Sequence, residues 1–240
     1  TISIPANIKK KKILKTNNFL VATSTTGQII NHNYFTLSYH EDHEQAEWVA
    51  YKITSNNFKI NIERTNDYRL DPKVTSESAD RDDYKGSDYD MGHLAPAKIM
   101  SHNYTSMSES FYLSNISPQL PSFNRGIWKR LESKVRYWSL NYDSLHVFSG
   151  PILSKPIGFI GKNKVSVPRA FYKTLVGFKE DKIKAIAFVI PHRKSDKSIY
   201  SYVVSIDKVE KITGIDFYYN LSNAIENRIE SNNDIKTWIK

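Results

Sequence analysis

The sequence predicts one α+β domain in which a central, mostly antiparallel sheet is flanked by helices. Three observations favour this fold class. Several short runs are rich in β-branched and aromatic residues, one long segment carries an apolar stripe at helical spacing, and no repeat, low-complexity linker or break in composition divides the 240 residues. With 40% hydrophobic and 12% aromatic residues, the chain has enough apolar material for a packed core.

The overall charge narrows the classes of partner. A formal net charge of +9 and a pI near 9.4 favour a polyanion, which could be nucleic acid, an acidic lipid surface or an acidic glycan. The absence of cysteine excludes disulfides and thiolate metal sites. No stretch approaches the roughly 20 apolar residues that span a bilayer, so stable membrane insertion is not expected.

Residues 1–20 are predicted to form a basic arm ahead of a domain over residues 21–240. The arm contains the lysine run Lys9–Lys12. A solvated arm is the preferred interpretation, and an arm that grips phosphates is the alternative. The chain opens on Thr1 rather than methionine, which is compatible with a leader removed by processing or cloning.

The first half of the domain predicts a strand, a long loop and a helix. Residues 47–54 are β-rich and partly alternating, so they predict a strand, and residues 55–57 supply a turn signal. Residues 65–90 are polar and aperiodic, which predicts a long loop of the kind that often carries function. Ser122 is expected to cap a helix that runs to about residue 141. Its apolar stripe consists of Ile127, Leu131, Val135 and Trp138.

The second half of the chain predicts the rest of the sheet and two short helices. Strand-like runs with proline at their edges cover residues 145–150, 170–178 and 183–190, with Pro151, Pro168 and Pro191 beside them. A short helix is expected to open at residues 205–207 and to end before Gly214. A last helix is expected over about residues 221–229.

The most informative segment is Asp90–Pro96, which reads Asp-Met-Gly-His-Leu-Ala-Pro. Its histidine, His93, is the side-chain type that accepts a proton near neutral pH. Gly92 is expected to allow a tight turn before it, Asp90 to accept hydrogen bonds that fix that turn, and Pro96 to stiffen the backbone beyond it. For this segment alone, a buried histidine that only hydrogen-bonds a loop is the alternative.

Three downstream residues offer oxygen atoms to such a site, namely Asn115, Asn124 and Glu132. Asn124 and Glu132 are eight positions apart on the predicted helix, which is two turns plus roughly 80°, so they are expected on neighbouring sides. A hard cation such as Mg²⁺ at the first turn could be reached by Asn124 directly and by Glu132 through a water. Taken singly, a helix cap and an exposed carboxylate explain Asn124 and Glu132 as well.

Together these motifs resemble the DNA/RNA non-specific endonucleases, the ββα-metal nucleases that include the endonuclease G group. The resemblance rests on Asp90–His93, on Asn115 in Asn-x-Ser-Pro-Gln, and on Asn124 and Glu132 in Asn-x-Gly-x-Trp-x-x-Leu-Glu. Further matches extend the resemblance to roughly residues 32–220. They lie in Trp48–Tyr51, Ser149–Pro151 and Val167–Lys173.

The resemblance implies a ββα-metal active-site motif and Mg²⁺-dependent hydrolysis of phosphodiester bonds in DNA and RNA, with Mn²⁺ as the alternative ion. Carried over by position, His93 would be the general base within the motif that Asp90 opens. Asn124 would be the direct protein ligand of a hydrated metal, and Glu132 would hold the water bound to it. Asn115 would support the site by hydrogen bonding.

Two positions at which the family has arginine bear on activity. The family places an arginine on the phosphate, for which Arg64 is the best match and Arg69 the second candidate. The family also has arginine where this chain has Met91, which removes a charge and up to five donors. A neutral replacement that leaves base and metal site working is the preferred interpretation. A weakened or inactive homologue that still binds nucleic acid is the alternative.

Other implications concern partners and location. Lysine and arginine contacts to phosphate would bind DNA and RNA without reading bases. The resemblance allows a monomer or a homodimer and implies export to the cell envelope or medium. The rival from another class is an interaction module whose lysine arm contacts a protein or membrane.

Two minor features have simpler explanations than function. His40 and His43 form a His-x-x-His pair, but a polar turn is favoured over a metal site. Tyr137, Trp138 and Tyr142 are explained by packing as well as by base stacking.

Overall fold

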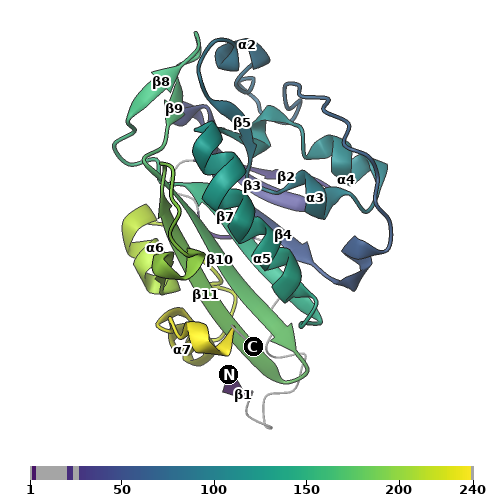
Figure 1. The fold of residues 1–240 in the computed structure, drawn as a ribbon, viewed down its shortest axis with the longest axis vertical. Coiled ribbons are helices and arrows are strands. Elements are labelled where there is room, and N and C mark those ends of the chain that lie inside the picture. The colour runs from purple at the N-terminus through teal and green to yellow at the C-terminus, as the bar shows by residue number, and fades with distance from the viewer. Residues whose placement is uncertain (1, 4–20, 24–26, 239–240) are drawn as a thin grey trace.

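The computed structural model describes residues 2–3, 21–23 and 27–238, so most of the predicted arm, including its lysine run, lies outside the described residues. The centre is an antiparallel sheet with the strand order β1-β11-β10-β7-β4-β3-β2, and β12 pairs with β11 (Figure 1). The strands are β1 Ile2–Ser3, β2 Gln28–Asn31, β3 Phe35–His40, β4 Gln45–Ile53, β7 Ser144–Pro151, β10 Ala170–Lys179, β11 Lys182–Pro191 and β12 Val203–Val204.

Two small antiparallel pairs and a set of helices complete the α+β fold. The pairs are β5 Asp90–His93 with β6 Ile116–Gln119, and β8 Gly158–Ile160 with β9 Val165–Val167. The α-helices are α2 Arg81–Tyr84, α3 Ala97–Met100, α4 Tyr104–Glu109, α5 Lys129–Ser139, α6 Ile206–Thr213 and α7 Asn223–Glu230. Short 3₁₀ turns cover Glu41–His43, Ser55–Phe58, Leu113–Asn115, Ile199–Tyr202 and Ile235–Thr237. Within the described part of the chain, no helix is long and apolar enough to cross a membrane.

Most predicted elements are confirmed. The four predicted strands fall in β4, β7, β10 and β11, and Pro151 and Pro191 end two of them. The short helix is α6. Ser205 Oγ accepts a hydrogen bond from the backbone N of Lys208 at 3.2 Å, and Gly214 ends the helix at φ 76°, where glycine has no steric penalty.

The start of the predicted long helix is different. Ser122 does not cap it, because its backbone is already helical (φ −68°, ψ −26°) and its side chain makes no capping hydrogen bond. Within Phe123–Trp128 the helix is kinked at Gly126, whose backbone angles are not helical (φ −102°, ψ −110°), and α5 then continues as a regular helix that ends at Ser139. Apolar periodicity indicates helical backbone but does not show where that helix is kinked.

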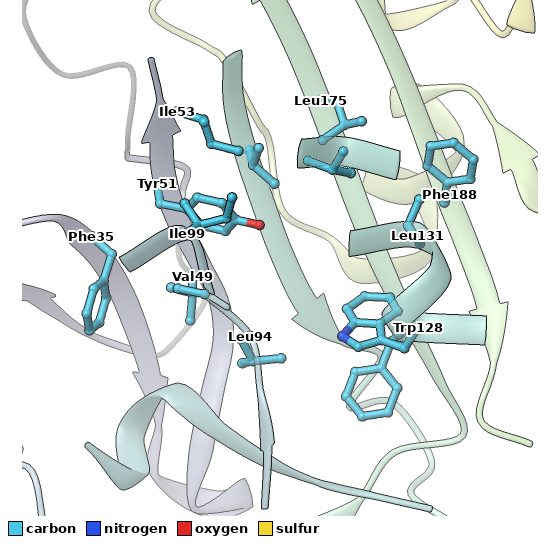
Figure 2. Packing of buried hydrophobic residues seen from close by; sticks show 14 of the residues in the cluster. Phe35, Val49, Tyr51, Ile53, Leu94, Ile99, Trp128, Leu131, Leu175 and Phe188 are labelled. Atoms are coloured by element: carbon cyan, nitrogen blue, oxygen red, sulfur yellow. The ribbon is translucent and has the colours of Figure 1, made fainter. Parts of the chain in front are cut away.

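The central sheet is buried on both faces. Along β10, Phe171 and Leu175 join the core under α5, whereas Tyr172 and Val176 join the core under α6 and α7. Figure 2 shows Leu131 of α5 packed over the first of these faces. Two-sided burial defines the register, because a slip of one residue would turn every side chain to the opposite face. Helix α5 is thereby fixed against the sheet by apolar contacts.

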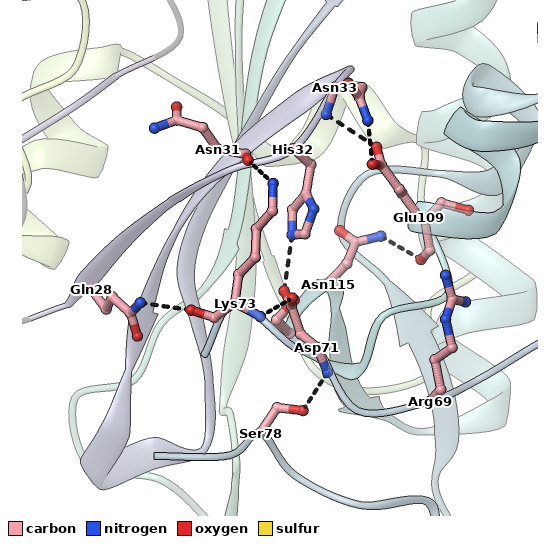
Figure 3. Close-up of polar contacts among 12 residues, drawn as sticks. Gln28, Asn31, His32, Asn33, Arg69, Asp71, Lys73, Ser78, Glu109 and Asn115 are labelled. Atoms are coloured by element: carbon pink, nitrogen blue, oxygen red, sulfur yellow. Dashed lines mark hydrogen bonds and ion pairs between the residues drawn. The ribbon is translucent and has the colours of Figure 1, made fainter. Parts of the chain in front are cut away.

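The long loop before β5 is anchored by buried polar contacts (Figure 3). His32 Nε2 lies 2.9 Å from Asp71 Oδ2, and both side chains are fully buried. Asp71 Oδ1 accepts a hydrogen bond from the backbone N of Lys73 at 3.0 Å. Nearby, Glu109 Oε2 accepts one from the backbone N of Asn33 at 3.1 Å. These contacts tie the loop and α4 to the connection between β2 and β3.

The Asp71 anchor leads to a pH-dependent prediction. Burial raises the pKa of the Asp71 carboxyl, but hydrogen bonds from His32 and Ser114 outweigh it and leave the pKa below its ordinary value. The stabilisation is therefore present above the unfolded pKa of about 3.9 and is lost as the pH falls through the lowered folded value. We expect Asp71→Asn to lower the free energy of unfolding by about 3 kcal/mol at neutral pH.

Urea denaturation at neutral pH and again below about pH 4 measures this effect. The difference between the parent chain and Asp71→Asn should shrink at the lower pH. Asp82→Asn, at an exposed position on α2, is the control and should change stability by less than about 0.5 kcal/mol. Equal midpoints for Asp71→Asn and the parent at neutral pH would contradict the anchoring role.

Candidate active site

A cleft of about 430 Å³ brings together four of the predicted site residues. Arg64, His93, Asn124 and Glu132 all line it, as does Met91. They come from the long loop, from β5, from the helical segment Phe123–Trp128 and from α5, which follows it. The β5–β6 pair and this helical segment form the predicted ββα arrangement.

His93 is the last residue of β5 and is held there by strand pairing, since it faces Ile116 of β6. Its side chain packs edge-on against Phe111, with ring centroids 4.8 Å apart, and the residue is 8% exposed. Its Nε2 is buried and has no hydrogen-bond partner among the described residues. Burial, followed by the positive charge of Arg64, lowers the pKa of His93 to about 3. The imidazole is therefore neutral near pH 7, the form that can accept a proton.

Gly92 has a role other than the predicted turn. It lies inside β5 opposite Ser117, so the chain continues as a strand at this point. A Cβ there would lie only 2.3 Å from Cδ of the buried Gln119 side chain. Glycine is needed because Gln119 approaches the backbone closely, which the sequence does not reveal. Pro96, by contrast, does stand where the chain leaves the motif, just before α3.

Asp90 orients Asn124. Its Oδ2 accepts a hydrogen bond from Asn124 Nδ2 at 2.9 Å, and Arg125 binds the same carboxylate through Nε at 2.9 Å and Nη2 at 2.6 Å. An ionised carboxylate only accepts hydrogen bonds, so it selects the amide nitrogen of Asn124 and leaves the amide oxygen for another partner. This oxygen, on a residue that lines the cleft, fits a hard divalent cation.

Glu132 stands on α5 and faces a buried lysine. Burial raises the pKa of Glu132, while the positive charges of Lys173, Arg136 and Arg64 oppose that rise. Lys173 is fully buried on β10, and its Nζ donates to Ser149 Oγ at 3.0 Å. Burial lowers the pKa of Lys173 and the Glu132 carboxylate opposes that change. Each charge therefore favours the ionised form of the other, and an anionic Glu132 can accept hydrogen bonds from water bound to a cation.

Asn115 is buried beside the cleft, and its side chain forms hydrogen bonds to the backbone there. Its Oδ1 accepts a hydrogen bond from the backbone N of Ala95 at 2.9 Å. Its Nδ2 donates to the backbone O of Ala95 at 3.0 Å and of Ser110 at 2.8 Å. Its own backbone O accepts from the N of Leu94 at 3.0 Å. Asn115 therefore fixes the two residues that follow His93.

The two arginine candidates are placed differently. Arg64 lines the cleft, where its guanidinium carbon lies 4.8 Å from the centre of the Phe111 ring and its Nη2 donates to Tyr68 Oη at 3.0 Å. Arg69 is instead bound to Asp67 Oδ2 at 2.8 Å and does not line the cleft. Met91 also lines the cleft, but its side chain adds no charge to it.

Several residues in or beside the cleft are not indicated by the sequence motifs. They are Tyr68, Phe111, Arg125, Lys129, Arg136 and Lys173. Lys129 and Arg136 stand three residues before and four residues after Glu132, so helical spacing predicts that all three share a face. The aromatic neighbours of His93 and the lysine on β10 have no comparable signal, because chain topology alone brings them close.

The minor features have structural roles. Glu41–His43 is a 3₁₀ turn, and His43 Nδ1 lies 2.8 Å from Ser166 Oγ. Trp138 is buried in the core, and Tyr137 is exposed beneath Lys134, whose Nζ lies 4.7 Å from its ring centre. The histidine pair thus stands at a short turn between β3 and β4.

Asn115 yields a prediction about stability. Asn115→Ala would leave three buried backbone groups without their partner, and each such group costs about 1–3 kcal/mol. We expect the free energy of unfolding to fall by about 3 kcal/mol or more, measured by urea denaturation. Asn227→Ala, at an exposed position on α7, is the matched control. An unchanged midpoint for Asn115→Ala would show that the backbone after His93 is held by other contacts.

The chain is similar in sequence and in fold to known nucleases. The chain is 31% identical over 221 residues to a nuclease of Nostoc sp., covering 84% of this chain and 77% of that protein. It is 30% identical over 209 residues to human mitochondrial endonuclease G, covering 81% and 70% of the two chains. In a solved structure of an EndoG/EndoGI complex, one chain matches with a TM-score of 0.78 at 28% identity, over 88% of this chain and 92% of that chain.

A family model of the DNA/RNA non-specific endonucleases matches residues 15–224. The match includes every residue that lines the cleft, and the related proteins are themselves nucleases. The chain therefore belongs to the DNA/RNA non-specific endonuclease family.

Proposed function

We propose that this chain hydrolyses phosphodiester bonds of DNA and RNA in a Mg²⁺-dependent reaction, with Mn²⁺ as an alternative ion. The observation that carries the proposal is the convergence of His93, Asn124 and Glu132 on one cleft, beside Arg64. A proton acceptor, oxygen ligands and a fixed positive charge are the parts that phosphodiester hydrolysis requires.

His93 is the general base in this proposal. A neutral ring with an unpaired nitrogen can take a proton from water as that water attacks phosphorus. The rings of Tyr68 and Phe111 limit how His93 can turn, since they pack against it at centroid distances of 5.7 Å and 4.8 Å. Their apolar surface also keeps the imidazole unprotonated.

Asn124 and Glu132 would hold the cation. The Asn124 amide oxygen would bind it directly, and the Glu132 carboxylate would accept hydrogen bonds from its water ligands. Asp90 keeps the Asn124 amide in the required orientation. When bound, the cation would stabilise negative charge on the scissile phosphate and on the leaving oxygen.

The basic residues would position the substrate strand. Arg64 can contact phosphate oxygens through its guanidinium fork, and Lys129 and Arg136 add positive charge along the same cleft. Contacts to phosphate carry no base information, so cleavage should tolerate any sequence and binding should weaken steeply with salt.

The basic test compares cleavage of plasmid DNA and structured RNA with Mg²⁺ and with EDTA. We expect His93→Ala and Asn124→Ala to lower the rate by about 100- to 10,000-fold, because each removes a part of the reacting assembly. His40→Ala, which lies away from this cleft, should cleave at the parent rate. Full activity of His93→Ala, or cleavage in EDTA, would refute the proposed mechanism.

A catalytically weak nucleic-acid-binding homologue is the second candidate, and Met91 is the observation that favours it. Met91 lines the cleft but offers neither charge nor hydrogen-bond donors to a phosphate. We expect Met91→Arg to tighten substrate binding and to steepen its salt dependence, with a rate equal to or above that of the parent. The measurement is KM and kcat at two salt concentrations.

Met91→Leu keeps the side chain uncharged and serves as the control for that experiment. If the parent binds nucleic acid without cleaving it and Met91→Arg restores cleavage, the binding-only function is supported for the natural chain. If Met91→Arg and Met91→Leu behave alike in binding and rate, position 91 has no special role.

We also retain three expectations from the sequence as proposals. The chain is a monomer or a homodimer, it is exported to the cell envelope or medium, and residues 1–20 form a solvated basic arm ahead of the nuclease domain. Sedimentation, cell fractionation and a chain that lacks residues 1–20 test them in turn.

A further inference from the structure

The face of the sheet opposite the cleft carries α6 and α7, where carboxylates converge. Asp207 and Glu210 stand on α6, and Glu230 is the last residue of α7. One carboxylate oxygen from each of these residues lies within 4.8 Å of the others. Like charges this close repel one another, so the arrangement requires a proton or a cation for balance.

Glu230 distinguishes this site from an ordinary acidic surface. The residue is only 4% exposed, and its Oε1 is buried without a hydrogen-bond partner among the described residues. It belongs to a different helix from Asp207 and Glu210, yet its carboxylate is directed toward theirs. Burying an unpaired carboxylate oxygen is costly, so this atom lacks a partner that either a proton or a cation would supply.

Among the described residues, the charged groups that most affect Glu230 do not supply a cation. Glu210 Oε1 accepts one hydrogen bond, from the backbone N of Phe217 at 2.8 Å. The charged groups that most affect Glu230 are all acidic and, after burial, raise its pKa to about 9. They are Glu210, Glu226, Asp207 and Asp216. The local charge is therefore negative in a chain whose formal net charge is +9.

We propose that Asp207, Glu210 and Glu230 bind a Ca²⁺ ion that joins α6 to α7. All three donors are oxygens, which suits a hard cation, and Ca²⁺ accepts irregular sets of six to eight oxygens at about 2.3–2.6 Å. Water can complete the shell on the exposed side of Asp207. Mg²⁺ is less suited because it needs a near-ideal octahedron at about 2.0–2.1 Å.

The site is separate from the catalytic cleft. Helices α6 and α7 pack on the apolar cluster that includes Val209, Ile225 and Ile229, whereas α5 packs on the other face of the sheet. A cation here would neutralise the buried carboxylate and stabilise the fold without contacting the substrate. The inference therefore does not depend on the proposed catalytic mechanism.

The test uses the full chain carrying Asn124→Ala, so that a cation in the cleft does not contribute. After EDTA treatment and removal of the chelator, thermal unfolding is followed as CaCl₂ is added to about 10 mM, above the weakest affinities of protein Ca²⁺ sites at about 10⁻³ M. We expect the Tm to rise with Ca²⁺ concentration, because a ligand that binds only the folded state stabilises it.

A Glu230→Gln substitution in the same background separates the cation from a shared proton. Without Ca²⁺ this variant should unfold at or above the Tm of its background, because a neutral amide replaces a carboxyl group that lies among other carboxylates. With Ca²⁺ it should lose the rise, so that the order of the two chains reverses. Asp181→Asn, in the exposed turn between β10 and β11, should keep the full rise.

Two results would overturn the proposal. One is a Tm that does not respond to Ca²⁺ in the Asn124→Ala chain, which would leave a shared proton as the balance among the carboxylates. The other is a full Ca²⁺ response after Glu230→Gln, which would place the binding elsewhere.

Discussion

Asn115 satisfies three backbone groups at once, and the geometry of the cleft depends on it. Strand β5 ends at His93, so beyond that residue the ladder with β6 no longer pairs the backbone. The Asn115 amide takes over from the ladder by pairing with both polar groups of Ala95. A single side chain thus substitutes for a strand partner at the point where the chain turns away from His93.

The other wall of the cleft is fixed by a different force. Helix α5 is held by apolar packing of residues such as Leu131 against the sheet, while Asn115 holds the β5 side by hydrogen bonds. The separation between His93 and Glu132 is therefore set by two anchors of unlike chemistry. Both anchors are rigid, because packed cores and satisfied polar networks each resist small displacements.

How far the sequence predicts this molecule depends on the range of the interactions. Helical and strand periodicity predicts the main elements well, since it reflects which face of each element is buried.

Motif resemblance predicts that His93, Asn124 and Glu132 belong to one site, and the structure places all three around one cleft. The motif resemblance favours Arg64 over Arg69, and the structure adds the reason why Arg69 is turned away from the cleft, since Asp67 and Ser108 bind its guanidinium. Lys173 and Phe111 escaped prediction because only tertiary folding brings them to the site. Gly92 was misinterpreted because the crowding comes from Gln119, on the other strand of the pair.

The helical segment Phe123–Trp128 is kinked at Gly126, whose backbone leaves helical angles (φ −102°, ψ −110°) just before α5 begins. An α-helix advances about 100° per residue, so removing one residue at Gly126 would rotate Asn124 by roughly that angle relative to α5. The apolar stripe of α5 would keep its place, because the sheet fixes it. A change of chain length at this kink would therefore turn the cleft-lining Asn124 away from its present direction without disturbing the core beneath α5.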